Sequence, residues 1–166
     1  MKIAVIGVGY VGLVTGTCLA AKNHKVKCFD TNEDNIKLLA NGKCPIYEPG
    51  LEELLISYNS NINFILLNED TKKEILEAEA VIIAVGTPNK NGRSDLKQIE
   101  TVARMLGSLI KNSDKYISFI IKSTVLPGTT DTFFRKLVEK ESIKKIGDFG
   151  LGMNPEFLRE GSAVYD

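Results

Sequence analysis

A strand, a glycine-rich turn and the start of a helix open the chain, and this arrangement constrains the fold more than any other part of the sequence. The apolar run Lys2–Ile6 leads directly into Gly7–Gly12 (GVGYVG), and a helical pattern covers Val11–Lys22. In such a unit the first glycine permits a tight turn, the second leaves room for a pyrophosphate, and the third lets the helix lie close to the strand. The free amides and the dipole at the helix start also favour phosphate groups.

Asp30 supports a dinucleotide site and indicates the cofactor. It ends the next apolar run, Lys25–Phe29, at about the 20-residue distance from the glycines that the pattern requires. A carboxylate there accepts hydrogen bonds from ribose hydroxyls but repels a 2′-phosphate, so we expect NAD rather than NADP. The alternatives are a helix N-cap or solvated strand end at Asp30, and a glycine turn without a ligand. The expected cofactor contacts in this unit are Gly7, Val8, Gly9, Tyr10, Val11, Gly12 and Asp30.

Composition excludes several other classes of protein. The 166 residues suit one domain with a buried core. Lysine and arginine balance aspartate and glutamate at 21 each, so no net field attracts nucleic acid or an anionic membrane. No apolar run approaches the roughly 18 residues of a membrane span. The three cysteines, Cys18, Cys28 and Cys44, lack metal-binding spacing, so we expect no metal site, and their odd number favours a reducing cytoplasm.

Strand and helix patterns alternate along the whole chain. Strands are expected at Lys2–Ile6, Lys25–Phe29, Asn63–Leu66, Ala80–Val85, Tyr116–Ile121 and Phe149–Met153, and helices at Val11–Lys22, Asn32–Ala40, Leu51–Ser57, Thr71–Glu77, Asp95–Ile110 and Thr129–Lys140. Asp95 and Gln98 have the spacing of a capping box. Right-handed crossovers then predict an α/β fold of the Rossmann type. It is a doubly wound parallel sheet of about six strands, in the order 3-2-1-4-5-6, within a three-layer α/β/α domain over residues 1–166.

Polar and glycine-rich segments follow the predicted strands, where an open parallel sheet binds its ligands. Gly86 and Thr87 follow one central strand, and Ser123 and Thr124 follow the next. Hydroxyls at these positions can hold a sugar, a nicotinamide or an ordered water, or they can simply bond the local backbone.

Two carboxylates, Glu156 and Glu160, follow the last predicted strand at the i, i+4 spacing. Should a helix begin at Pro155, both would lie on one face. One could then act as a general base, while the other held a ribose or a nicotinamide amide. Alternatively, the acids merely favour the first turn of a helix.

Five segments together resemble the UDP-glucose/GDP-mannose dehydrogenase family, in the order that the family shows. They are Gly7–Gly12 (GVGYVG), Ile46–Leu51 (IYEPGL), Val85–Pro88 (VGTP), Lys122–Thr129 (KSTVLPGT) and Asn154–Asp166 (NPEFLREGSAVYD). The sequence REGS at Arg159–Ser162 is more similar to the UDP-glucose branch than to the GDP-mannose branch, where Ser-Thr commonly replaces Gly-Ser.

The resemblance implies an NAD-dependent, four-electron oxidation of the C6 alcohol of a nucleotide sugar to a carboxylate. UDP-glucose would give UDP-glucuronate with two NAD, through a cysteine-bound thiohemiacetal and thioester. Glu156 would assist proton transfer to and from water, and Thr124 would help to hold that water. The implied substrate contacts are Glu156, Phe157, Leu158, Arg159 and Glu160, and the further cofactor contacts are Asn35, Gly86, Thr87, Ser123, Thr124 and Glu160. Relatives often carry arginine or lysine where Asn35 stands.

The resemblance also implies that the nucleophilic cysteine, a catalytic lysine, a dimer-forming helix and a UDP-binding domain lie beyond Asp166. We therefore expect an N-terminal domain of a longer enzyme, homodimeric or larger, that binds NAD without turnover. One alternative is a stand-alone, non-catalytic NAD-binding module, and a second is a dehydrogenase for another nucleotide sugar such as GDP-mannose. Another is a hydroxyacid or phosphogluconate dehydrogenase, which accounts for the first glycines but not for IYEPGL or NPEFLREG.

Overall fold

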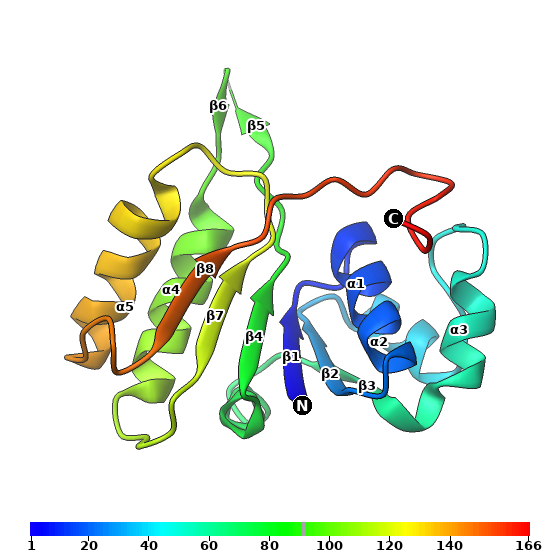
Figure 1. Ribbon diagram of the computed structural model, residues 1–166, viewed down its shortest axis with the longest axis horizontal. Helices are drawn as coiled ribbons and strands as arrows, with labels where there is room; N and C mark the ends of the chain where they lie inside the picture. Colours follow the sequence, from blue (N-terminus) through cyan, green and yellow to red (C-terminus); the bar gives the residue numbers. More distant parts are fainter. Residues whose placement is uncertain (91) are drawn as a thin grey trace.

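The computed structural model describes residues 1–90 and 92–166, and over these residues it contains a parallel sheet of six strands in the order β3-β2-β1-β4-β7-β8 (Figure 1). The strands are β1 (Lys2–Ile6), β2 (Lys25–Asp30), β3 (Ile62–Leu66), β4 (Ala80–Ile83), β7 (Ser118–Ile121) and β8 (Gly150–Met153). This confirms the predicted strands, with ends that shift by a few residues, and the predicted order. The direction of winding reverses between β1 and β4, so the crevice in which open parallel sheets bind their ligands is expected at the carboxyl ends of those two strands.

Helices cover both faces of the sheet. They are α1 (Tyr10–Ala21), α2 (Glu33–Ala40), α3 (Leu51–Ser57), α4 (Lys97–Ile110) and α5 (Arg135–Ser142), with short 3₁₀ helices at Asn59–Asn61 and Lys72–Glu77 and a π-helix at Thr129–Phe134. Figure 1 shows α1, α2 and α3 on one side of the sheet and α4 and α5 on the other. Alternate residues of β1 serve the two cores: Ile3 and Val5 pack with α1 to α3, and Ala4 and Ile6 pack with α4 and α5.

Several local predictions need correction. Helix α4 begins after Leu96, and Asp95 accepts a hydrogen bond from the Lys97 amide at 3.0 Å. The predicted capping box is incomplete because the Gln98 Oε1 atom accepts from the Gly86 amide at 3.0 Å. The sequence analysis also missed a small antiparallel hairpin of β5 (Asn89–Lys90) and β6 (Arg93–Ser94).

The helix considered after Pro155 is absent from the described structure. Residues 154–166, the crossing segment, instead run from β8 over the crevice toward α3 without regular structure and end in turns (Figure 1). Glu156 Oε1 accepts a hydrogen bond from the Leu158 amide at 2.6 Å, which competes with a helical turn. The proposed shared helix face for Glu156 and Glu160 is therefore wrong. In the described residues, no helix has the length and apolarity needed to span a membrane.

Phe119 should be the most costly aromatic side chain to remove from the core beneath α4 and α5. It is fully buried, with ring centroids 6.3 Å from Phe134 and 5.7 Å from Phe149. We expect Phe119→Ala to lower the free energy of unfolding by about 3–5 kcal/mol in urea denaturation. Phe157→Ala is the matched control, since its side chain is 81% exposed. Equal losses in the two variants would contradict this assignment of the core.

Candidate functional site

Loops that follow five strands gather at the carboxyl edge of the sheet, as the sequence predicts. The Val8 amide after β1 donates to Oδ2 of Asp30, the last residue of β2, at 2.6 Å. Thr87 after β4 donates its hydroxyl to the Thr124 carbonyl after β7 at 2.7 Å. The Tyr10 hydroxyl lies 3.4 Å from the Arg159 carbonyl in the crossing segment, which begins after β8. These contacts join the predicted cofactor and substrate residues around one crevice.

The glycine loop, residues 7–12, contains two glycines at which a side chain would collide with the backbone, and one, Gly9, that faces free space. Gly7 has φ +94°, and a Cβ there would lie 2.6 Å from the Ala84 carbonyl oxygen. A Cβ on Gly12 would lie 1.9 Å from the Gly7 carbonyl oxygen. A Cβ on Gly9 would meet nothing within 4 Å. The open approach at Gly9 therefore fits a ligand that comes close to the backbone.

The start of α1 has the properties of an anion site. The amides of Tyr10, Val11 and Gly12 precede the first helical hydrogen bond, which runs from Leu13 to Gly9. Neither a capping side chain at Gly9 nor an acidic residue in the first turn compensates the helix dipole here. The residues present therefore fit the pyrophosphate of a dinucleotide.

Asp30 is held in a fixed position at the end of β2. Besides the bond from Val8, its Oδ1 atom accepts from the Asn32 amide at 2.8 Å. The N-cap of α2 is Asn32, which accepts from the Asn35 amide at 3.1 Å, so the N-cap alternative for Asp30 is wrong. Each carboxylate oxygen keeps acceptor capacity for ribose hydroxyls. Asn35 is half-buried in the first turn of α2.

The loops after β4 and β7 are bonded to each other. The Ser123 hydroxyl is buried and donates to the Val85 carbonyl at 2.6 Å, and the Gly86 amide is bonded to Gln98. The Ser123 hydroxyl thus bonds the backbone of the neighbouring loop and holds the two loops together. Thr124 is exposed at the carboxyl edge, and its position suits contact with a ligand or an ordered water.

Glu156 lies beside Lys122, whose contribution the sequence analysis missed. Lys122 Nζ donates to Asn154 Oδ1 at 2.7 Å and lies 3.7 Å from Glu156 Oε2, with side chains that are 11% and 16% exposed for the lysine and the glutamate. Glu156 Oε2 is buried and has no hydrogen-bond partner within the described chain. A carboxylate that is held at one oxygen and has no hydrogen-bond donor at the other can act as a base when a ligand or water reaches it. The position of Lys122, directly after a predicted strand, could have indicated it.

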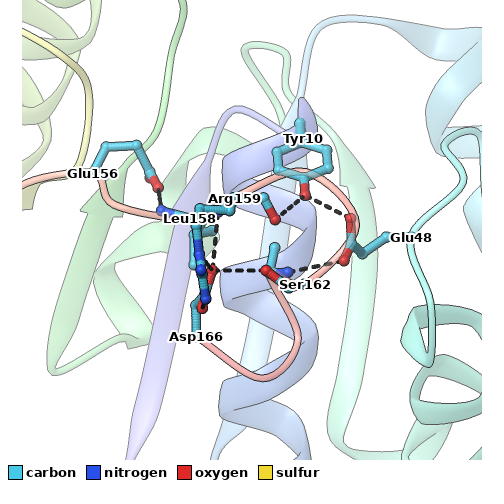
Figure 2. A network of polar contacts seen from close by, with 8 residues as sticks. Tyr10, Glu48, Glu156, Leu158, Arg159, Ser162 and Asp166 are labelled. Atoms are coloured by element: carbon cyan, nitrogen blue, oxygen red, sulfur yellow. Dashed lines mark hydrogen bonds and ion pairs between the residues drawn. The ribbon is translucent and has the colours of Figure 1, made fainter.

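The remaining predicted substrate residues lie along the crossing segment. Phe157 is 81% exposed, Leu158 is half-buried, and Glu160 is exposed. Arg159 pairs with Asp166 through Nη2 and Oδ1 at 2.5 Å, and its amide donates to Asp166 Oδ2 at 3.0 Å. The hydrogen bonds from Arg159 lower the pKa of Asp166 to about 2. The segment therefore closes on itself as a small ring, visible in Figure 2.

Glu48 is a second residue that the sequence analysis missed, although it lies within the IYEPGL motif. Glu48 is 4% exposed. Its Oε2 atom accepts hydrogen bonds from the Tyr10 hydroxyl at 2.6 Å and from the Gly161 amide at 2.8 Å. Its Oε1 atom accepts one from the Ala163 amide at 2.9 Å. Figure 2 shows Tyr10 and Glu48 facing each other beside the crossing segment. The bond from Tyr10 lowers the pKa of Glu48, while burial and the Glu48 carboxylate raise the pKa of Tyr10 to about 12.

The cysteines are unsuited to nucleophilic chemistry in this structure. Burial raises the pKa of the Cys18, Cys28 and Cys44 thiols, so each holds its proton more firmly than an ordinary cysteine. In the part of the chain that the structure describes, no group of histidine, cysteine, aspartate or glutamate side chains could hold a metal ion.

Comparisons with known proteins extend over the whole chain. The model of the UDP-glucose/GDP-mannose dehydrogenase family, NAD binding domain, matches residues 1–166. The chain is 44% identical to GDP-mannose 6-dehydrogenase of Pseudomonas aeruginosa, over 100% of this chain and 38% of the relative. It is 43% identical to UDP-glucose 6-dehydrogenase TuaD of Bacillus subtilis, over 99% of this chain and 35% of the relative. A crystal structure of a ternary complex of GDP-mannose dehydrogenase from P. aeruginosa superposes with a TM-score of 0.93, at 44% identity, over 100% of this chain and 38% of that one.

Substitution by alanine should weaken NAD binding at Gly9 and lower the folding stability at Gly12. In Gly9→Ala we expect the free energy of unfolding to change by less than about 0.5 kcal/mol, because the added methyl meets no protein atom. The methyl enters the space for the pyrophosphate, so NAD binding in calorimetry should weaken about tenfold. Gly12→Ala should lower the stability itself, because its methyl collides with the Gly7 carbonyl. Wild-type NAD affinity in Gly9→Ala would contradict the site.

Acid should release the crossing segment from Glu48. Because the pKa of Glu48 in the folded chain lies below its ordinary value of 4.5, its hydrogen bonds add stability above that pH, and this stability is lost as the pH falls through the folded pKa. In an NMR pH titration, the Gly161 and Ala163 amide shifts should move together, with a midpoint below 4.5. Neither shift should follow this titration in Glu48→Gln. A midpoint above 4.5 would show that the carboxylate is not stabilised by these contacts.

Proposed function

We propose that this chain, which belongs to the UDP-glucose/GDP-mannose dehydrogenase family, is the NAD-binding part of a longer enzyme. That enzyme would oxidise the C6 alcohol of a nucleotide sugar to a carboxylate. The chain spans 38% of the length of the P. aeruginosa relative, so the activity of a whole enzyme is part of the proposal. The observation that carries it is the position of the crossing segment. Through Tyr10 and Arg159, this segment brings Glu156 and Glu160 to the same edge as the open approach at Gly9.

UDP-glucose is the substrate that we propose first, with UDP-glucuronate as the product and two NAD consumed. The support is the REGS sequence at Arg159–Ser162, which resembles the UDP-glucose branch of the family. GDP-mannose is the second candidate, because the P. aeruginosa relative named for it is 44% identical.

The proposed roles combine the geometry at the carboxyl edge of the sheet with what the resemblance to the family implies. NAD, when bound, supplies the oxidising capacity that accepts hydride from the sugar. The glycine loop holds the pyrophosphate, and Asp30 holds the adenosine ribose. Glu156, through its available Oε2 atom, acts as the base toward water, while Lys122 balances its charge and Thr124 helps to hold that water. The backbone of residues 157–159 runs along the sugar, Glu160 contacts both ligands, and Asn35, Gly86, Thr87 and Ser123 complete the cofactor site.

The whole enzyme is proposed to work in the cytoplasm as a homodimer or a larger assembly. All three cysteines are free thiols, which agrees with a reducing compartment. Because none of these thiols is activated, we propose that the chain described here binds NAD but does not turn over.

Calorimetric titration with NAD and NADP tests the proposal. The wild-type chain should bind NAD, and NADP should bind at least about tenfold more weakly because its 2′-phosphate meets Asp30. Asp30→Ala should weaken NAD binding about tenfold through the loss of charge-assisted bonds to the ribose. Asp34→Ala, which removes an exposed carboxylate in the first turn of α2, is the matched control.

Two outcomes would contradict the proposal. Failure of the wild-type chain to bind either cofactor would leave the glycine turn with a structural role alone. Formation of NADH after addition of UDP-glucose would contradict only the absence of turnover, because it would show that this chain alone oxidises the sugar.

A further inference from the structure

Glu48 joins three parts of the chain that are distant in the sequence. It comes from the loop that precedes α3, and it binds Tyr10 at the start of α1 together with Gly161 and Ala163 in the crossing segment. Figure 2 shows the Tyr10–Glu48 contact beside the ring that Arg159 and Asp166 close.

The environment of Glu48 requires a carboxylate. A buried charge is costly unless hydrogen bonds satisfy it. Here one hydroxyl and two backbone amides point at two oxygens, and all three groups act as donors. A glutamine would offer one acceptor oxygen in place of two, so at least one of these donors would lose its partner or have to turn away.

Glu48 and Tyr10 also provide the polar attachment of the far end of the crossing segment, whereas its near end is bonded to β7 and Lys122 through Asn154. Within the described residues, the hydrogen bonds from residues 157–166 to parts of the chain outside the crossing segment involve Glu48 and Tyr10, and the Arg159–Asp166 pair holds the segment to itself. Ala163 is 2% exposed and packs in the same apolar cluster as Leu51 and Leu55 of α3. The hydrogen bonds to Glu48 therefore determine where this anchored end of the segment meets the start of α1.

Tyr10 places this attachment next to the cofactor site. It follows Gly9 directly and is the first residue of α1, so its amide belongs to the group proposed to face the pyrophosphate. A ligand that fixes the backbone of Tyr10 also fixes the position from which its hydroxyl reaches Glu48. A ligand at the glycine loop and the attachment of the crossing segment consequently act on the same residue.

We propose that Glu48 is a positioning residue that couples NAD binding to the order of the crossing segment. This inference rests on the proposed function. NAD at the glycine loop steadies Tyr10, Tyr10 steadies Glu48, and Glu48 holds the Gly161 and Ala163 amides, which places the segment that carries Glu156 and Glu160. Linkage makes the effect reciprocal, so the attached segment raises NAD affinity by the same factor by which NAD stabilises the attachment.

Amide hydrogen exchange at Gly161 and Ala163, measured by NMR with and without NAD on this chain, tests the coupling. In wild type, NAD should slow exchange at both amides. Glu48→Gln should speed exchange without NAD by about tenfold, because a charged acceptor is lost. Glu53→Gln, in the exposed first turn of α3, is the matched control and should match wild type.

Tyr10→Phe separates coupling from simple stability. Both amides keep their acceptor in this variant, so exchange without NAD should stay within about threefold of wild type. The slowing caused by NAD should disappear, and NAD affinity should fall by the factor by which NAD slows exchange in wild type. Continued protection of the Phe119 amide in β7 shows that each variant is folded, and Tyr10→Phe carries the test if Glu48→Gln unfolds.

The exchange rates of the Gly161 and Ala163 amides distinguish failure of the coupling from failure of the proposed function. The proposal is overturned if wild type binds NAD while exchange at Gly161 and Ala163 stays the same, or if Tyr10→Phe retains the full slowing; in both cases the proposed function survives. Absence of NAD binding by wild type overturns the proposed function and, with it, the coupling. Slowing in wild type that is lost in Tyr10→Phe supports the coupling.

Discussion

The close contact between the start of α1 and the turn after β1 determines what the rest of the crevice can be. The Gly12 backbone packs against the Gly7 carbonyl so closely that a methyl group would not fit, and Gly7 in turn faces the strand end at Ala84. This packing directs the helix dipole into the space above β1 and β4. The Val8 amide, which Asp30 binds, and the Tyr10 side chain, which reaches Glu48, take their positions from the same turn.

Three carboxylates in and around the crevice differ in how many of their hydrogen-bond positions the chain itself fills. Glu48 is enclosed by donors at both oxygens, which suits a residue that holds other parts in place. Asp30 is fixed by two amides at the carboxyl edge and keeps capacity for ribose hydroxyls. Glu156 is bound by an amide at one oxygen, and its other oxygen faces Lys122. The same functional group thus supports a structural, a binding and a catalytic assignment.

Features that depend on local pattern could be predicted from the sequence, and features that depend on distant contacts could not. The strands and their order follow from apolar runs and right-handed crossovers, and Gly7 to Gly12 with Asp30 follow from a spacing that the fold itself requires. Gln98 departed from its expected cap because it found a partner 12 residues away in Gly86. Glu48 was missed because its partners lie 113 and 115 residues away, at Gly161 and Ala163, and no local pattern encodes such contacts.

The strand order has a consequence for how the chain folds. β1 lies in the middle of the sheet, and its register pairs Ile3 with Val26 of β2 and with Ala80 of β4. The first partner follows closely along the chain, whereas the second arrives only after α2, α3 and β3 have been made. During synthesis β1 therefore keeps one unpaired apolar edge, and closing it requires a long-range contact that forms slowly. In this interval the exposed edge of β1 can pair with strands of other chains. The nascent chain therefore depends on the rapid arrival of β4, because β1 lies at the centre of the sheet.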